Sequence, residues 1–175
     1  AYRIEKRDLL SRDPEDPTLT QQIGRVASTG IELAFAAEPI ENWTIEANIA
    51  ALRAEYQEFN ERVSGKLVDR AGFIPSGVPE RSANIWTSWR FDPQWQVSLG
   101  ARYVGTRPTN NANDAWLPSY TVSNAAVAYD YSEKLKFSLQ VNNLTDRIYA
   151  VSGTGDKRWL LAEPRTLQLT ARLTF

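Results

Sequence analysis

The last segment of the chain, residues 166–175, alternates between polar and apolar side chains at every position. The apolar set is Leu167, Leu169, Ala171, Leu173 and Phe175, and polar residues and one arginine occupy the positions between them. Successive side chains of a β-strand point to opposite faces, so a period of two residues separates these two sets. The segment therefore predicts a strand that lies between an apolar and a polar environment.

The same alternation recurs along the chain and predicts about eight strands. In the strand that begins at Leu135, every second residue is apolar up to Val141, but the next such position is the polar Asn143. This change predicts that the strand leaves the lipid at Asn143. The predicted strands are Tyr2–Asp8, Gln22–Ala36, Trp43–Phe59, Arg81–Phe91, Trp95–Gly105, Tyr120–Tyr131, Leu135–Val141 and Pro164–Phe175.

The connections between these segments alternate in length. Short turns cover residues 37–42, 92–94 and 132–134, whereas the polar segment 11–17 and the segments 60–79, 106–118 and 149–163 are longer. All short turns then lie on one side of the sheet, as in outer-membrane barrels with short periplasmic turns, and unlike a Greek-key sandwich. The pattern predicts an all-β, antiparallel, up-and-down transmembrane β-barrel segment in the bacterial outer membrane, with the C-terminus on the periplasmic side.

Aromatic residues are placed near both ends of the predicted strands. Amphipathic rings favour the two membrane interfaces, so this placement predicts two aromatic girdles. The short-turn ends carry Trp43, Phe91, Trp95, Tyr131 and Phe175, and the long-loop ends carry Tyr56, Phe59, Tyr103, Tyr120 and Tyr149.

Composition excludes several other classes of function. The chain has no Cys and no His, and its net charge is −1 with scattered Lys and Arg. It therefore lacks the commonest general base and shows no basic patch for nucleic acid. No nucleophile, acid–base pair or metal cluster is recognisable, so we expect no enzyme and no cofactor. Asn143 and Asp146 are expected to hydrogen-bond nearby backbone groups where the strand pairing loosens.

Several segments resemble motifs of TonB-dependent outer-membrane receptors. The segment Val141–Tyr149 (VNNLTDRIY) resembles a motif near their C-terminus, and Leu173–Phe175 resembles their terminal aromatic β-signal. Further similar segments occur in the family order, namely Arg25–Leu33 (RVASTGIEL), Pro79–Trp86 (PERSANIW), Tyr103–Gly105 and Leu117–Val122.

The resemblance implies that residues 1–175 are the C-terminal part of a barrel of about 22 strands, without the plug domain. It implies import of a ferric siderophore as the transported ligand, with energy from the TonB–ExbB–ExbD complex. The partners would be outer-membrane lipid, the missing N-terminal strands and the plug. Ligand contacts are expected from aromatic residues and arginines of the long loops, because such side chains suit an anionic or catecholate chelate. These candidates are Arg107, Trp116, Tyr149, Arg158 and Trp159.

Several charged residues and glycines fall on the predicted lumen face. Charges facing mid-bilayer lipid cost about 2–4 kcal/mol for Arg or Lys, so they are expected to face water or partners. We favour bracing of the barrel wall over contact with the plug or the substrate, and expect the glycines to permit close backbone approach or bending. The charged residues are Glu32, Glu46, Arg90, Arg102 and Arg172, and the glycines are Gly24, Gly30 and Gly100.

Two other functions stay open on the sequence alone. The chain could form a passive outer-membrane pore or a small, complete eight-stranded barrel, although Gly, Ala and long Arg side chains are mixed on its lumen face. It could also form a soluble two-sheet binding module, which would stay monomeric in plain buffer. The membrane interpretation predicts aggregation without detergent instead, because edge strands and an apolar band would be uncovered.

Overall fold

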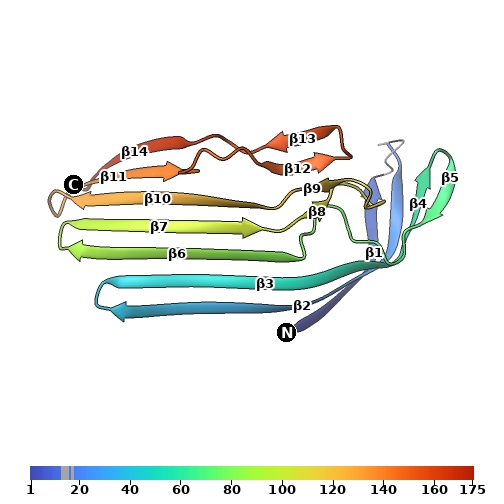
Figure 1. Cartoon of the computed structure of the whole chain (residues 1–175), viewed down its shortest axis with the longest axis horizontal. Helices are drawn as coiled ribbons and strands as arrows, with labels where there is room; N and C mark the ends of the chain where they lie inside the picture. Colours follow the sequence, from blue (N-terminus) through green and yellow to red (C-terminus); the bar gives the residue numbers. More distant parts are fainter. Residues whose placement is uncertain (13–15, 17) are drawn as a thin grey trace.

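The computed structural model describes residues 1–12, 16 and 18–175, and strands joined by turns and loops make up this part of the chain (Figure 1). Among these residues, no helix is long and apolar enough to cross a membrane. One large sheet contains β1 (Tyr2–Arg12), β2 (Thr20–Ile40), β3 (Trp43–Glu58), β6 (Arg81–Asp92), β7 (Trp95–Val104), β10 (Tyr120–Asp130), β11 (Leu135–Asn142) and β14 (Thr166–Leu173). Three small hairpins contain β4 (Asn60–Val63), β5 (Lys66–Asp69), β8 (Arg107–Pro108), β9 (Trp116–Leu117), β12 (Ala150–Thr154) and β13 (Arg158–Leu161).

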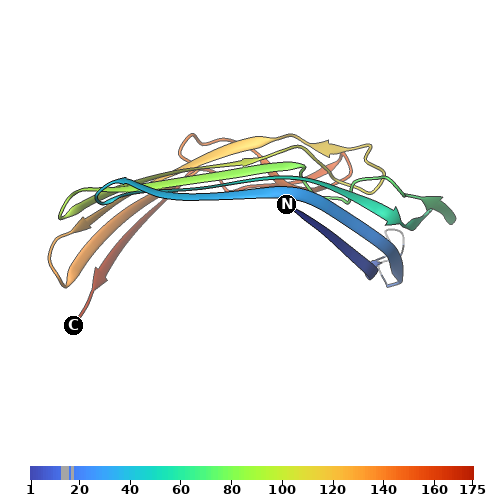
Figure 2. The ribbon, with the colours of Figure 1, turned by 90° about the horizontal axis from the view of Figure 1, so that it is seen from below.

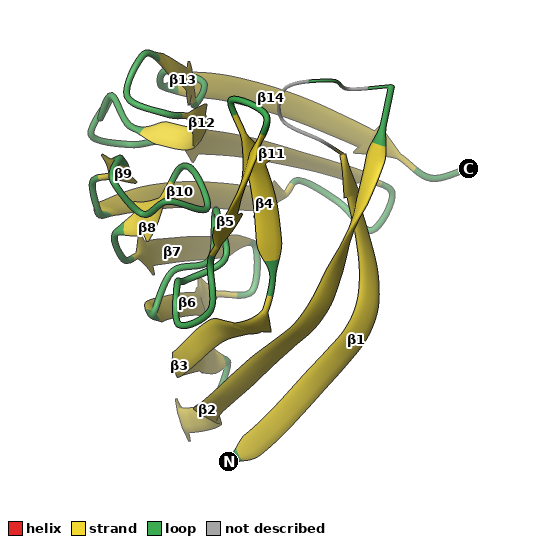
Figure 3. Ribbon diagram, turned by 90° about the vertical axis from the view of Figure 1, so that its right-hand side faces the viewer, coloured by secondary structure: helices red, strands yellow, loops and turns green. Residues whose placement is uncertain are grey.

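The large sheet is an up-and-down meander. Its eight strands follow the order β1-β2-β3-β6-β7-β10-β11-β14, and every neighbouring pair is antiparallel. The sheet is arched, and its two outer strands, β1 and β14, each pair on one side only (Figures 2 and 3). The prediction of an antiparallel barrel segment is confirmed, whereas the two-sheet module is wrong. The barrel is not closed by these strands alone.

Cross-strand register gives the sheet one apolar and one polar face. Leu33 pairs with Ile49 and Ile49 with Ala83, and two residues further along Phe35, Ala47 and Ile85 form the next row. Paired residues share a face, so these apolar side chains make a continuous band. The band is uncovered, with Leu33 65% and Leu169 76% exposed. An uncovered band of this kind fits lipid as its solvent.

The boundaries of the predicted strands mostly agree with the structure, but the first two strands are longer. β1 continues past Asp8 to Arg12, and β2 begins at Thr20 and ends at Ile40. Two residues of the predicted polar loop 11–17 are therefore strand, whereas 13–15 and 17 lie outside the described residues. The predicted turn 37–42 shrinks to Glu41 and Asn42, because Asn42 takes a positive φ of 64° that allows a tight reversal.

The long loops contain three hairpins that the sequence did not indicate. They are short, with two to five residues in each strand, and they lack the alternation that marks the main strands. The loops also form small cores of their own. Tyr56 and Phe59 pack with Val26 and Phe73, and Leu117 is almost completely buried. The long-loop end of the sheet is therefore folded rather than open.

Only one of the two predicted aromatic girdles is present. At the short-turn end, Trp95 contacts Tyr129 with ring centroids 4.5 Å apart, and Trp89 contacts Phe91 at 5.8 Å. These rings share the uncovered face. The second girdle is wrong for Tyr56, Phe59 and Tyr120, which are buried, and for Tyr149, which stacks on Tyr120; only Tyr103 lies on the apolar face.

Register explains why most of the long-loop aromatics do not form a girdle. Tyr56 and Tyr120 occupy the polar-face positions of their strands, because each is an even number of residues from inward-facing neighbours such as Leu52 and Val122. Their rings therefore turn into the cores under the loops. Proximity to a strand end in the sequence does not determine the face that a side chain occupies.

Asn143 ends β11 as the sequence predicted. It has a positive φ of 52° and is buried, and its backbone N–H donates to Asn124 Oδ1 at 2.9 Å. Its side-chain amide donates to the carbonyl of Arg147, and its Oδ1 accepts from the Arg147 N–H. Asp146 accepts from the Arg165 N–H at 2.7 Å. The predicted backbone-bonding role of both residues is confirmed.

Candidate functional site

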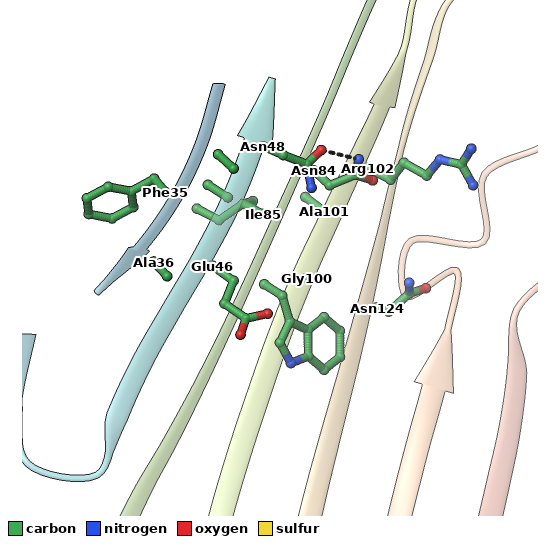
Figure 4. A pocket seen from close by; sticks show the side chains of 13 residues that line it. Phe35, Ala36, Glu46, Asn48, Asn84, Ile85, Gly100, Ala101, Arg102 and Asn124 are labelled. Atoms are coloured by element: carbon green, nitrogen blue, oxygen red, sulfur yellow. Dashed lines mark hydrogen bonds between the residues drawn. The ribbon is translucent and has the colours of Figure 1, made fainter. Parts of the chain in front are cut away.

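The polar face of the sheet carries a shallow groove near its centre. Register aligns Ala36, Glu46, Trp86, Gly100 and Asn124 in one row across β2, β3, β6, β7 and β10. The groove has a volume of about 610 Å³, and the next row contributes Asn48, Asn84 and Arg102 to its wall (Figure 4). The polar face of the sheet therefore carries a polar hollow that spans five neighbouring strands.

Two charged groups in this groove are not neutralised by the wall. The Asn84 amide donates to Asn48 Oδ1 at 2.9 Å, which satisfies those two side chains. Among the described residues, neither Glu46 nor Arg102 has an ion-pair partner. Figure 4 shows the Glu46 carboxylate and the Arg102 guanidinium reaching away from each other. Both charges are available to a molecule in the lumen.

Arg90 differs from the groove charges because it braces the wall. Its Nη1 donates to Asp130 Oδ2 at 3.1 Å and its Nη2 to Gln96 Oε1 at 3.1 Å, while Lys136 Nζ shares the same Asp130 oxygen at 3.2 Å. The bracing predicted for the lumen charges is therefore confirmed for Arg90. Glu32, Glu46, Arg102 and Arg172 face the lumen, as predicted, but make no such bond within the described part of the chain.

The glycines of the lumen face allow close approach of backbone at two positions and of a side chain at the third. A Cβ added to Gly100 would lie 2.1 Å from Trp86 Cε3, so the indole occupies the space above this glycine. A Cβ at Gly30 would approach the Tyr2 hydroxyl at 2.9 Å and Ala51 O at 2.8 Å, and one at Gly24 would approach Glu58. The expected close backbone approach is confirmed at Gly30, by Ala51 O, and at Gly24, where Glu58 O would lie 3.1 Å from an added Cβ. It is wrong for Gly100, where a neighbouring ring fills the gap.

The predicted loop residue Arg107 lies in the interior of the loop region. It is 4% exposed, and its Nη2 donates to the carbonyls of Ala150 at 2.8 Å and Val151 at 2.9 Å. Its guanidinium lies 5.5 Å from the Tyr120 ring centroid, and its buried Nη1 has no partner. These contacts join the loop that begins at β8 to β12, so Arg107 positions two loops in this structure.

Tyr149 packs against a small core at the long-loop end of the sheet, which contains Val104, Tyr120 and Val122. Its ring stacks on Tyr120 with centroids 4.2 Å apart. Burial raises the pKa of the Tyr149 phenol and Tyr120 raises it further, whereas Arg102 lowers it. The phenol therefore stays protonated and able to donate a hydrogen bond at neutral pH.

The other three predicted ligand residues are exposed. Trp116 is 42% and Trp159 47% exposed, and Arg158 also faces solvent. The Trp116 indole N–H donates to the carbonyl of Asn113 at 2.8 Å. β9 and β12 are in contact, and the hydroxyl of Thr109 donates to the carbonyl of Gly155 at 2.9 Å. The structure thus brings the two hairpins together, and ligand contact by these residues stays a prediction.

A polar cluster between two loops was missed by sequence reasoning. The Tyr56 hydroxyl donates to Asn111 Oδ1 at 2.8 Å, and the Asn111 amide donates to Glu61 Oε1 at 2.9 Å. Glu61 is 6% exposed and pairs with Arg70 Nε at 2.8 Å. The only signal in the sequence was the opposite charge of Glu61 and Arg70 within one loop. That signal does not identify Asn111, which belongs to another loop, as a partner. Among the described residues, no group of three or more potential metal ligands is present.

The sequence of this chain is similar to those of known outer-membrane receptors. Residues 1–144 match the family model described as TonB dependent receptor-like, beta-barrel. The chain is 29% identical to the probable TonB-dependent siderophore receptor PiuA of Acinetobacter baumannii, over 99% of this chain and 24% of that protein. It is also 29% identical to the ferrioxamine B receptor of Salmonella typhimurium, over 86% of this chain and 22% of that protein.

Solved structures agree with the sequence comparison. The crystal structure of the siderophore receptor PiuA from Acinetobacter baumannii superposes with a TM-score of 0.83 at 28% identity, over 98% of this chain and 25% of that chain. The ferric yersiniabactin uptake receptor FyuA from Yersinia pestis has a TM-score of 0.79 at 20% identity, which shows the fold alone. The chain therefore spans about a quarter of the length of the relatives that it matches.

Proposed function

Because the chain belongs to the TonB dependent receptor-like β-barrel family, we propose that residues 1–175 form the C-terminal part of the barrel of an outer-membrane receptor for a ferric siderophore. The remaining strands and the plug domain would belong to the rest of that protein. One observation carries the proposal: the eight-stranded sheet has an uncovered apolar face and an opposite polar face with a groove. Such a two-faced wall suits lipid outside and an aqueous lumen inside.

The proposed orientation follows from the two ends of the sheet. The short turns and the aromatic cluster at Trp95 and Tyr129 would face the periplasm, together with the C-terminus, and the folded loops would face the outside of the cell. In this orientation, Arg102 and Tyr149 lie on the path from the loops to the lumen. A ligand entering from outside would reach Trp116, Arg158 and Trp159 first.

The chemistry of these residues suits an anionic iron chelate. Guanidinium groups at Arg102 and Arg158 attract negative charge, and the rings of Trp116, Tyr149 and Trp159 provide apolar contact area. Arg107 would act by positioning the loops rather than by touching the ligand.

Iron is the cargo and arrives already chelated, so the wall needs no metal ligands. Energy for moving the plug would come from the TonB–ExbB–ExbD complex. The names of the relatives, which include receptors for ferrioxamine B and for catecholate siderophores, support a siderophore as ligand.

An uptake assay tests this proposal directly. The full-length protein is expressed in a strain without its own siderophore receptors, and radioactive iron uptake is measured with hydroxamate and catecholate siderophores. We expect uptake with at least one siderophore class, and its loss in a strain that lacks TonB. No uptake with any siderophore, in cells whose outer membrane contains the protein, would contradict the proposal.

The same assay separates a receptor from a passive pore. Uptake that continues without TonB would favour the pore. The small complete barrel is not supported, because the outer strands β1 and β14 do not pair with each other in the sheet.

A further inference from the structure

Three arginines lie on the apolar face at its long-loop border. Arg81 pairs with Ala51, and Ala51 with Ile31, so Arg81 continues the apolar rows. One row further out, Arg53 pairs with Thr29, and Thr29 with Arg3. Paired residues occupy the same face of a sheet. Arg3, Arg53 and Arg81, which we call the arginine row, therefore point toward lipid and not toward the lumen.

The height of the arginine row matches the edge of a membrane. Trp43 lies at the short-turn end of β3, and Arg53 lies ten positions further along the same strand. Ten residues of an antiparallel strand extend about 34 Å, which becomes roughly 26 Å along the membrane normal at a tilt of about 40°. The apolar band of an outer-membrane barrel is about 25 Å tall. The arginine row thus meets the level of the lipid headgroups.

The nearby carboxylates leave positive charge in excess at this level. Glu55 pairs with Arg53 Nε at 2.5 Å, while Glu5 pairs with Arg7 at 2.8 Å. In the described part of the chain, Arg3 and Arg81 have no ion-pair partner, and all three arginines of the row are exposed. A hollow of about 580 Å³ beside the row is lined by Thr29, Ile31, Ala51, Arg53 and Arg81, together with Ala1, Tyr2, Gly30, Leu52 and the carboxylate residue Glu80. The four arginines at this level, Arg3, Arg7, Arg53 and Arg81, still outnumber the three carboxylates, Glu5, Glu55 and Glu80.

We propose that the arginine row binds the phosphate groups of lipopolysaccharide in the outer leaflet. Guanidinium groups form bidentate, charge-assisted hydrogen bonds with phosphate, and Arg suits this role better than Lys. The acyl chains would then lie against Ile31, Leu33 and Ile49, which are all more than half exposed. The inference rests on the orientation proposed above, because the opposite orientation would place the row at the phospholipid leaflet.

Binding of lipid A by the purified full-length protein in detergent tests the inference. We compare the protein with a triple variant, Arg3→Gln, Arg53→Gln and Arg81→Gln. The matched control, Arg62→Gln, Lys66→Gln and Lys134→Gln, removes the same number of charges at exposed positions outside the row. We expect the triple variant to bind bis-phosphorylated lipid A at least tenfold more weakly, and the control to bind like the wild type. Dephosphorylated lipid A should bind the wild type as weakly as the triple variant binds the phosphorylated lipid.

Three results would overturn the inference. They are equal binding of lipid A by the triple variant and the wild type, equal weakening by the control, and a preference of the wild type for phosphatidylglycerol. If the triple variant does not fold, the double variant Arg3→Gln and Arg81→Gln replaces it, since neither residue forms an ion pair in the described chain. Siderophore binding is measured on the same samples. If the wild type binds a siderophore but the triple variant binds lipid A as strongly as the wild type, this inference alone is refuted. If the wild type binds no siderophore, the proposed function is refuted.

Discussion

At the scale of single residues, the pair of Gly100 and Trp86 shows how the lumen wall is fitted together. The indole of Trp86 lies where a Cβ at position 100 would be. Register makes the two residues direct neighbours across β6 and β7. Position 100 therefore requires glycine because the Trp86 ring fills the space of a Cβ. The backbone of Gly100 does not itself require glycine, since its φ is not in the left-handed region. Trp86 also donates its N–H to Ser88 Oγ at 3.1 Å, so displacement of the ring would break a hydrogen bond.

Substitution of Gly100 by Ala should destabilise the barrel through crowding. Overpacking of this kind costs about 1–3 kcal/mol, because the ring must leave its place. The double variant Gly100→Ala, Trp86→Ala should lose less stability than the sum of the two single variants. Urea unfolding of the full-length protein in lipid vesicles measures all three free energies. Additive losses would show that the ring and the glycine do not depend on each other.

Removal of the Arg107 guanidinium should loosen the loops without weakening the sheet. In Arg107→Met, the carbonyls of Ala150 and Val151 lose their donor, and each unsatisfied buried group costs about 1–3 kcal/mol. We expect faster amide hydrogen exchange in residues 149–163 and unchanged exchange in β7 and β10. The matched variant Arg158→Met, at an exposed position, should leave exchange as it is. Unchanged loop exchange in Arg107→Met would contradict the positioning role.

The residue scale also shows where sequence reasoning ends. Parity placed Glu46 and Arg102 on the lumen face correctly, because a period of two is local information. The burial of Arg107 depends on carbonyl groups more than forty positions away, and no local pattern contains them. The same holds for Tyr56 and Glu61, whose contact passes through Asn111 of another loop.

At the scale of elements, we propose that the end of β14 contributes to assembly of the barrel but not to its stability once folded. β14 ends at Leu173, and Phe175 is fully exposed beyond it. The side chain thus contributes little to the packing of the sheet. If the terminal aromatic residue is read as an assembly signal, as the family resemblance implies, its effect must be exerted before folding is complete.

The variant Phe175→Ala should therefore lower the amount of protein in the outer membrane but not its stability once folded. We expect a several-fold lower level in membrane fractions, and an unfolding free energy within about 0.5 kcal/mol of the wild type, as for ordinary surface substitutions. Leu169→Ala serves as the comparison, because Leu169 belongs to the apolar band. Equal membrane levels of Phe175→Ala and the wild type would argue against an assembly role.

The main strands were predictable as elements because each carries its own alternation and a recognisable turn. The small hairpins were not, since Ala150–Thr154 and Arg158–Leu161 pair across a bulge and have no apolar period. β1 was predicted too short because its outer part, from Leu9 onward, pairs with β2 beyond the level of the apolar band. Backbone hydrogen bonds to β2 stabilise that extension. Such bonds leave no pattern of polar and apolar residues, so the sequence could not predict the extension.

At the scale of the whole molecule, the chain should not be soluble by itself. Its apolar face is uncovered, and the strands β1 and β14 expose unpaired edges. Both features favour association between chains. We expect residues 1–175 to sediment as large aggregates in plain buffer and to disperse in detergent. A sharp monomer peak without detergent would contradict a membrane role for the apolar face.

Every strand of the large sheet pairs only with the strands next to it along that sheet, in a simple meander. The hairpin is therefore a unit of circumference. In the complete barrel of the proposed receptor, inserting or deleting one hairpin would change the circumference by two strands and leave the other strand pairs intact. Duplication or loss of a hairpin thus offers a gradual route by which such barrels could widen or narrow during evolution, without changes to the existing strand pairings.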